Sequence, residues 1–249
     1  MAAVDTPRAT RLGARLRWRV ARLVERRDET PTARTLVFEV ADWPEHLAGQ
    51  HVDVRLTAED GYTAQRSYSL AAPADGDRVE LTVQRVPGGE VSPFLADVLA
   101  VGDPVELRGP VGGWFVWRPE DPRPVLLVAG GSGIVPLMAM IRARRTAASR
   151  VPFRLVYSVR SPYDVYYADE LRPAMDGVDI TYVYTRQTPD GWRSPPRRIT
   201  PADLSRGGWP PEFAPACFVC GPTGFVETAA DMLVDLGHDP GYVKTERFG

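Results

Sequence analysis

Residues 125–136 read Val-Leu-Leu-Val-Ala-Gly-Gly-Ser-Gly-Ile-Val-Pro. An uninterrupted apolar run that passes into glycines and then into a second apolar stretch predicts a buried strand, a tight turn and a helix. Bare backbone N–H groups in such a turn, together with the positive potential of a helix N-terminus, favour a phosphate or pyrophosphate group. The stretch therefore predicts an α/β fold that holds a nucleotide at this turn.

Three established patterns do not fit this turn. Pro136 stands where the G-x-G-x-x-G dinucleotide fingerprint has its third glycine. The Gly-Lys-Ser/Thr ending of a Walker loop is missing, and Ile134 occupies the place of the second glycine of a nucleophile elbow. Pro136 falls in the first helical turn, where a missing N–H costs little. The turn thus stays a candidate pyrophosphate site without a complete fingerprint.

Apolar strands alternate with helical stretches after Pro119-Glu120-Asp121-Pro122. The expected strands are 125–129, 154–159, 179–184 and 217–220, and the expected helices are 135–145, 163–172 and 224–236. This alternation predicts a parallel sheet in a Rossmann-like domain. Ligands bind outside the carboxyl ends of such strands, so Cys220 and Gly221 should face the same crevice as Gly131. Cys217 and Cys220 should point to opposite faces of their strand, which argues against a metal or dithiol site.

The first half of the chain follows a different pattern. Apolar and basic residues alternate from Arg15, and further short strands are expected at 35–40, 50–56, 65–70, 78–86 and 104–108. Turn signals such as Asp60-Gly61 and Pro87-Gly88-Gly89 separate them, so we expect an antiparallel barrel or sandwich. The expected division is a disordered tail at 1–13, a barrel domain at 14–119 and a nucleotide domain at 120–249.

The stretch Arg66-Ser67-Tyr68-Ser69-Leu70 combines a cation with an aromatic ring. Strand alternation places Arg66 and Tyr68 on one face. Arginine binds phosphate through two parallel hydrogen bonds, and a tyrosine ring can stack on a planar heterocycle. Ser69 adds a hydroxyl that can donate or accept. A flavin nucleotide has all the matching groups; an ordinary amphipathic strand is the alternative.

A second anion site is expected where a helix follows the Gly88-Gly89 pair. Ser92 is typical of an N-cap and Pro93 of a first helical residue. A helix N-terminus after glycines can bind an anion. The alternative is a capped surface helix without a ligand.

Composition narrows the function. The 249 residues carry a net charge of −2 and 44% hydrophobic residues, so nothing global indicates nucleic acid. No apolar run reaches the length of a membrane span, and we expect no secretory signal. Two cysteines do not form a disulfide framework, and a cytoplasmic location is expected. The Arg-rich start, with Arg8 and Arg11, could be a transit peptide or a docking arm, or simply a solvated terminus.

Four motifs then follow one another along the chain: Arg66-x-Tyr68-Ser69, Gly89-x-x-Ser92, Gly130-Gly131-Ser132-Gly133-Ile134-x-Pro136 and Cys220-Gly221-Pro222. In this order they resemble the ferredoxin–NADP⁺ reductase family, and especially the flavin/nicotinamide module of oxygenase reductases. The resemblance runs from about residue 15 to the end of the chain. It implies an antiparallel β-barrel flavin domain followed by a Rossmann-like parallel-sheet nucleotide domain. The four closely spaced cysteines of a plant-type ferredoxin domain are missing, which implies a separate electron acceptor.

The resemblance also implies roles for the matching residues. Ser69, Cys220 and Glu246 would lie around the hydride transfer. The flavin would be held by Arg66, Ser67, Tyr68, Ser69, Thr82, Val83, Gln84, Gly89, Val91, Ser92 and Phe248. The nicotinamide dinucleotide would be held by Gly131, Ser132, Ser158, Arg160, Thr185, Arg186, Cys220 and Gly221. No metal ligand is implied.

Within that set, Arg66 would bind the flavin phosphate, Tyr68 would stack on the ring and Phe248 would cover it. Thr185 and Arg186 match a 2′-phosphate pair. Arg160 would join them, unless Asp164 or Asp169 pairs with it.

The sequence thus predicts an FAD-dependent NADPH oxidoreductase that passes hydride to flavin N5 and then electrons to a ferredoxin or oxygenase. FMN and NADH are the less favoured cofactors. A flavin, ferric or quinone reductase with a diffusible acceptor is one alternative, and a nucleotide-sensing regulatory flavoprotein is another. The cluster Arg15, Arg17, Arg19 and Arg22 suggests an acidic iron–sulfur partner. We expect a monomer that binds neither nucleic acid nor membrane.

Overall fold

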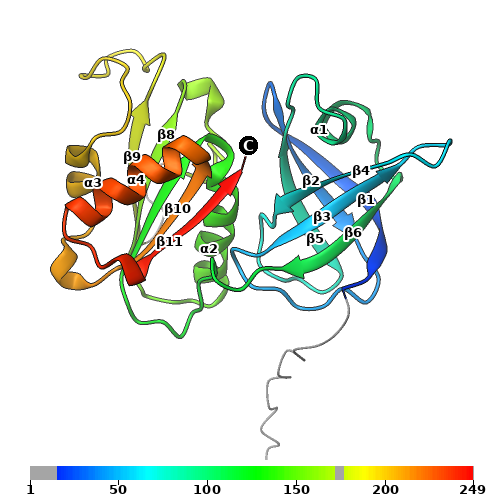
Figure 1. Ribbon diagram of the computed structural model, residues 1–249, viewed down its shortest axis with the longest axis horizontal. Coiled ribbons are helices and arrows are strands. Elements are labelled where there is room, and N and C mark those ends of the chain that lie inside the picture. The colour runs from blue at the N-terminus through cyan, green and yellow to red at the C-terminus, as the bar shows by residue number, and fades with distance from the viewer. Residues whose placement is uncertain (1–15, 172–176, 249) are drawn as a thin grey trace, which may run out of the picture.

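The protein, described by a computed structural model over residues 16–171 and 177–248, has two β-sheets that stand side by side (Figure 1). The first half of the chain forms an antiparallel sheet and the second half a parallel sheet. The expected two-domain architecture is therefore confirmed. The expected tail at 1–13 lies outside the described residues, and the expected boundary at 119 falls in the connection between the two sheets.

The antiparallel sheet is rolled into a barrel. Its strands are β1 (Trp18–Thr30), β2 (Ala33–Glu39), β3 (His51–Thr57), β4 (Thr63–Ser69), β5 (Arg78–Gln84) and β6 (Pro104–Val111), in the order β4-β3-β6-β1-β2-β5. The two end strands meet where Leu70 pairs with Leu81 and the Ala71 N–H donates to the Glu80 carbonyl at 2.8 Å. Alternation sends apolar side chains inward, and Phe38 and Leu107 are among those fully buried.

A short helical segment joins β5 to β6. The segment α1 (Val91–Pro93) continues as a π-helix at Phe94–Val98. The expectation that Ser92 caps this helix is wrong, because the helix begins before it. The Gly88-Gly89 turn brings the chain back over the segment, and the Ser92 Oγ instead accepts the Val86 N–H at 3.1 Å.

The parallel sheet carries helices on both faces. Its strands are β7 (Val125–Gly130), β8 (Phe153–Val159), β9 (Val178–Tyr184), β10 (Ala216–Pro222) and β11 (Val243–Phe248), in the order β11-β10-β7-β8-β9. The helices are α2 (Ile134–Thr146), α3 (Pro201–Gly207) and α4 (Thr223–Asp235). Helix α2 lies between the sheet and the barrel, while α3 and α4 cover the outer face (Figure 1). No helix within the described ranges is long and apolar enough to cross a membrane.

The helix expected at 163–172 is wrong over its described part. A 3-10 turn at Pro162–Asp164 is followed by irregular chain, and Tyr167 has a left-handed φ of 56°. The Tyr167 N–H donates to Glu29 of the barrel at 2.9 Å, and its hydroxyl donates to Thr82 at 2.6 Å. The Tyr167 N–H is therefore used in a tertiary hydrogen bond, while the Tyr167 carbonyl still accepts the Leu171 N–H in a single turn. Arg172 lies outside the described residues.

One apolar cluster runs through the domain interface. It contains Ala48, Ala71 and Trp117 next to Leu137 and Met140 of α2. Because these side chains are buried together, the two sheets hold a fixed relation to each other, and the carboxyl ends of the parallel strands face the barrel.

Candidate functional site

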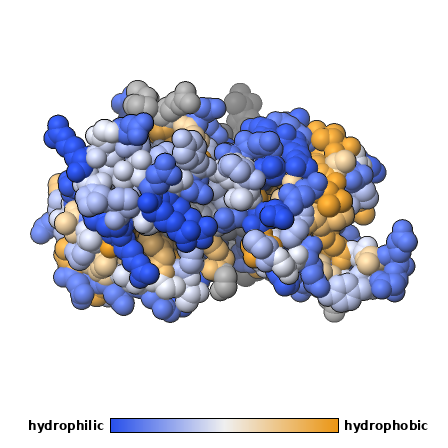
Figure 2. All heavy atoms as spheres, turned by 90° about the horizontal axis from the view of Figure 1, so that it is seen from above, coloured by the Kyte–Doolittle hydropathy of each residue, from blue (hydrophilic) through white to orange (hydrophobic). Residues whose placement is uncertain are grey.

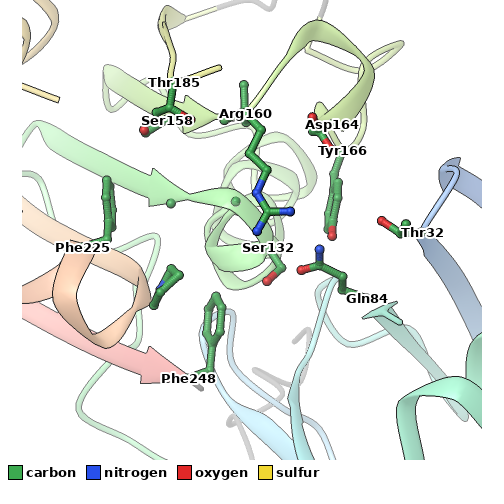
Figure 3. Close-up of a pocket in the computed structure, with 14 residues that line it drawn as sticks. Thr32, Gln84, Ser132, Ser158, Arg160, Asp164, Tyr166, Thr185, Phe225 and Phe248 are labelled. Atoms are coloured by element: carbon green, nitrogen blue, oxygen red, sulfur yellow. The ribbon is translucent and has the colours of Figure 1, made fainter. Parts of the chain in front are cut away.

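A cleft of about 230 Å³ lies at the carboxyl ends of the parallel strands, and the barrel closes one side (Figure 3). Every parallel strand ends at or beside it. Its lining comprises Gly130, Gly131, Ser132, Ser158, Val159, Arg160, Asp164, Tyr166, Thr185, Pro222, Phe225 and Phe248, with Thr32 and Gln84 from the barrel. Seven residues predicted from the sequence line this one cleft: Gln84, Gly131, Ser132, Ser158, Arg160, Thr185 and Phe248.

The glycine turn is built by close approach of two backbones. Gly131 has a φ of 54°, and a Cβ on Gly133 would lie 2.1 Å from the Cys220 carbonyl oxygen. Any side chain at position 133 would collide with the backbone of β10, so the turn can pack against this strand only with glycine there. No side chain caps the start of the turn or of α2, so the first N–H groups are available to an anion.

Arg160 projects into the middle of the cleft between Ser132 and Tyr166 (Figure 3). Its guanidinium has no hydrogen-bond or ion-pair partner among the described residues. Asp164, one expected partner, instead accepts the Ser161 hydroxyl at 2.5 Å. An unpaired cation beside a glycine turn suits a phosphate group. Arg186, by contrast, does not line the cleft; its backbone N–H bonds the Arg160 carbonyl at 2.9 Å.

The surface around this cleft is polar. Figure 2 views the molecule from the side on which the parallel strands end. Hydrophilic atoms predominate on this face of the nucleotide domain, with hydrophobic atoms along one edge, and a further hydrophobic patch lies on the barrel half. This distribution agrees with a charged ligand on the nucleotide domain.

The three residues expected around hydride transfer come together between the domains. The Ser69 hydroxyl donates to Glu246 Oε1 at 2.9 Å, which joins the end of β4 to β11. Glu246 pairs in register with Cys220 on β10. Burial raises the pKa of the Glu246 carboxyl, while the Ser69 hydrogen bond works in the opposite direction. Burial, and then the nearby Glu246, raise the pKa of the Cys220 thiol.

The barrel residues divide between the two faces of β4. Arg66 is exposed, and Tyr68 on the same face is half-buried against the barrel core near Phe94. Ser67 points to the other face, where its hydroxyl donates to Asp53 at 2.7 Å. Helix α1 contacts β4, so the Arg66 side of the barrel also holds Ser92.

Three expected flavin residues have occupied or buried side chains. The Thr82 hydroxyl is bonded to Thr35 at 2.8 Å and to Tyr167, and Val83 and Val91 are buried in the barrel core. Only their backbone groups remain for a ligand. Gly89 lies in the turn before α1, next to the Ser92 hydroxyl.

The remaining predicted residues shape the walls. Phe248, at the end of β11, lies below Ser132 at the cleft and packs on the shared apolar cluster. Gly221 must be small, because a Cβ there would lie 2.8 Å from the Phe225 ring. Cys217 and Cys220 belong to clusters on opposite faces of the sheet, as alternation predicts.

The sequence did not reveal Thr32, Asp164, Tyr166 and Phe225 as lining residues. Asp164 reaches the cleft from the 3-10 turn Pro162–Asp164, and Tyr166 reaches it from the turns that follow, where a helix was expected. Phe225 follows Pro222 by three residues, at the start of the helix after the Gly221-Pro222 turn. Its closeness to that turn was the one sequence feature that could have predicted Phe225 as a lining residue.

A second cavity, of about 560 Å³, runs along β9, the edge strand of the parallel sheet. Tyr182, Tyr184 and Trp192 contribute rings, and Arg193 and Arg197 contribute charge. None of the site residues predicted from the sequence lines it, so it is separate from the cleft.

Comparisons with known proteins agree with this arrangement. The oxidoreductase FAD-binding domain model matches residues 20–116, and the oxidoreductase NAD-binding domain model matches residues 127–231. Ferredoxin–NADP reductase B of Sorangium cellulosum is 34% identical over 238 residues, 92% of this chain and 96% of that protein. The toluate 1,2-dioxygenase electron transfer component of Pseudomonas putida is 28% identical over 81% of this chain, but this chain spans only 58% of its length.

A solved structure shows the same fold. The flavohem-like FAD/NAD-binding domain of nitric oxide dioxygenase from Vibrio cholerae superposes with a TM-score of 0.83 at 26% identity. The match covers 93% of this chain and 98% of that domain, so both sheets and their connection are shared.

Proposed function

We propose, from the premise that this chain belongs to the ferredoxin–NADP⁺ reductase-like family of flavin oxidoreductases, that it carries electrons from NADPH through FAD to a separate acceptor. One observation supports this most strongly. Arg160, whose guanidinium has no hydrogen-bond or ion-pair partner within residues 16–171 and 177–248, lines one cleft with the glycine turn, and Ser69 and Glu246 bridge the domains beside it. Glu246 precedes Phe248, which lines the cleft, on the same strand β11, and this links the proposed phosphate site to the Ser69–Glu246 pair.

The barrel would hold FAD. Arg66 would bind a flavin phosphate, since its exposed guanidinium bonds only the neighbouring Gln65 carbonyl among the described residues, and Tyr68 would pack against the ring. The turn at Gly89 and the start of α1 would supply backbone N–H groups. Bound FAD would supply the hydride-accepting and one-electron chemistry that no side chain can perform.

The nucleotide domain would hold the dinucleotide. Gly131 and Ser132 would donate N–H groups to its diphosphate, and Arg160 would neutralise charge there. Ser158 and Thr185, which line the cleft, and Arg186, which follows Thr185 outside the lining, would surround the 2′-phosphate, which favours NADPH over NADH. Gly221 and Cys220 would leave room for the nicotinamide beside β10.

Ser69, Glu246 and Cys220 would position the two rings. The Glu246 carboxyl, whose pKa is raised by burial, can hold a proton next to the Ser69 hydroxyl. Phe248 would exclude water from the ring it covers. We name no general base, because hydride transfer does not need one.

The acceptor would be a separate iron–sulfur protein or oxygenase, as the names of the Pseudomonas and Sorangium relatives suggest. A flavin, ferric or quinone reductase with a diffusible acceptor is the rival function. Arg17, Arg19 and Arg22 remain the proposed docking cluster for an acidic partner; Arg15 lies outside the described residues. The cytoplasmic location and the monomeric state stay part of this proposal.

The test is anaerobic reduction of the FAD-loaded protein by NADPH and by NADH. One charge-assisted contact of about 2 kcal/mol corresponds to about thirtyfold in affinity. Arg186→Ala should therefore lower kcat/KM for NADPH about thirtyfold and leave NADH nearly unchanged. Arg193→Ala, at the second cavity, serves as the matched control and should change neither. Equal loss with both nucleotides would refute the 2′-phosphate assignment, and a protein that no nicotinamide reduces would refute the function.

A further inference from the structure

Tyr166 lies at the cleft in a position that sequence reasoning did not reveal. It is 3% exposed, and it lines the cleft with Ser132, Arg160 and Gln84. Figure 3 shows its ring pointing into the cleft, with the hydroxyl toward Gln84 and beside the Arg160 guanidinium. The hydroxyl is itself buried, and it lies at the end of the ring that points into the cleft.

The Tyr166 hydroxyl has no hydrogen-bond partner within the described part of the chain. Its neighbours differ: the Tyr167 hydroxyl donates to Thr82 at 2.6 Å, and the Tyr157 hydroxyl accepts the Tyr166 N–H at 3.4 Å. A buried hydroxyl without a partner is unfavourable, and native proteins rarely leave one unpaired. The other buried side-chain atoms of the described residues without a hydrogen-bond partner are Arg34 Nε, Trp117 Nε1 and Arg154 Nε. Of these four residues Tyr166 alone lines the cleft, and this place points to a partner outside the chain.

The surroundings identify the chemistry of that partner. Burial, and then the nearby Asp164, raise the pKa of Tyr166 well above its ordinary value, and Arg160 opposes this shift more weakly, so the hydroxyl remains a donor. The same wall offers the Arg160 cation and the bare N–H groups after Gly131, which all donate. The Asp164 carboxylate also lines the cleft, but it already accepts the Ser161 hydroxyl. Converging donors require an acceptor-rich anion.

We propose that the Tyr166 hydroxyl donates a hydrogen bond to the diphosphate of the bound nicotinamide dinucleotide, next to Arg160. The donors belong to the nucleotide domain, whereas the barrel contributes only Thr32 and Gln84 to this cleft. The partner is thus the dinucleotide of the α/β domain rather than the flavin. This inference rests on the proposed function for the identity of the ligand.

The experiment compares Tyr166→Phe with the adjacent Tyr167→Phe in FAD-loaded protein, using calorimetric titration with NADP⁺ and with NAD⁺. Tyr166→Phe should weaken both nucleotides about tenfold, because the diphosphate is common to them. The melting temperature without nucleotide should stay the same or rise, since the variant removes an unpaired buried hydroxyl. Tyr167→Phe should show the reverse. Its melting temperature should fall, because Thr82 keeps the bond to Thr35 but loses the one from Tyr167, and its nucleotide affinity should be unchanged.

Other outcomes would overturn the assignment. Unchanged NADP⁺ and NAD⁺ affinity in Tyr166→Phe means that the hydroxyl does not contact the dinucleotide. If Tyr166→Phe retains FAD less well but binds NADP⁺ normally, the Tyr166 hydroxyl contacts the flavin phosphate and not the dinucleotide. Loss for NADP⁺ alone moves the contact to the 2′-phosphate. Failure of the wild-type protein to bind either nucleotide is distinct from these results, because it removes the proposed function itself.

Discussion

Glu246 is a carboxyl group in an environment that does not favour its charge. Burial raises its pKa above the ordinary value of 4.5, and the Ser69 hydroxyl offsets this only in part. Because the folded-state pKa is the higher one, the group's contribution to stability is fully present below the unfolded value. It is lost as the pH rises through the folded pKa. The ionised Glu246 carboxylate therefore lowers the stability of the folded protein near neutral pH.

Glu246→Gln should therefore raise the melting temperature at pH 8, and the gain should shrink toward zero at pH 4. The amide retains an oxygen that accepts the Ser69 hydroxyl, so the change isolates ionisation from the hydrogen bond. Thermal melts of both proteins across this pH range measure the difference. Glu227→Gln, on the exposed side of α4, is the control and should give a flat difference. A pH-independent gain at Glu246 would mean that packing, not charge, is responsible.

The glycine turn is the element on which the nucleotide domain depends. Gly133 has an ordinary φ of −61°, so its requirement for glycine comes only from contact with the Cys220 carbonyl. A methyl group at this place must push the turn away from β10. Overpacking of this kind costs about 1–3 kcal/mol.

Gly133→Ala should lower the melting temperature by about 2–12 °C, since 1 kcal/mol corresponds to about 2–4 °C at this chain length. Nucleotide affinity should fall as well, because the bare N–H groups move with the turn. Gly224→Ala in α4 is the matched control, since a Cβ there meets nothing within 4 Å. It should leave the protein unchanged or stabilise it by up to about 1 kcal/mol. Equal effects at both glycines would contradict the contact argument.

Elements with strong local signals were predictable from the sequence. The β7 run and the glycine turn define a buried strand and a helix start, and the barrel strands alternate as expected. Strand β11 (Val243–Phe248) was missed because its polar residues show no apolar run. The helix expected at 163–172 failed because Tyr167 makes its hydrogen bonds to the barrel instead. Long-range contacts of this type leave no local pattern.

The site residues also divide into those with a local sequence signal and those placed by long-range contacts. Arg160, Ser132 and Thr185 follow strand ends, and topology alone brings such ends to one edge. Tyr166 could not be found, since its place depends on a turn that no propensity favours. The occupied hydroxyl of Thr82 was equally hidden, because its partners come from two distant segments.

The whole molecule depends on how its two sheets are joined, and Arg142 is central to that junction. From α2 its guanidinium pairs with Glu80 of β5 and with Glu170, and it donates to the Ala71 carbonyl at 2.9 Å. It also lies 4.9 Å from the centroid of the Tyr167 ring. The Arg142 and Glu80 side chains are each 14% exposed, so solvent screens this pair weakly.

Arg142→Ala should leave the Glu80 carboxylate buried beside the interface. Among the described residues, Arg27 would then be its one remaining ion-pair partner. Breaking a buried ion pair from one side costs about 3 kcal/mol or more, so we expect a fall in melting temperature of about 6–12 °C. Because Arg142 joins the domains, we expect calorimetry to resolve two transitions in the variant and one in the wild-type protein. Arg145→Ala is the control: Arg145 is 41% exposed and lies 3.6 Å from Glu170, and exposed pairs contribute less than about 1 kcal/mol. A single, unshifted transition in Arg142→Ala would place the cohesion of the two domains in the apolar cluster alone.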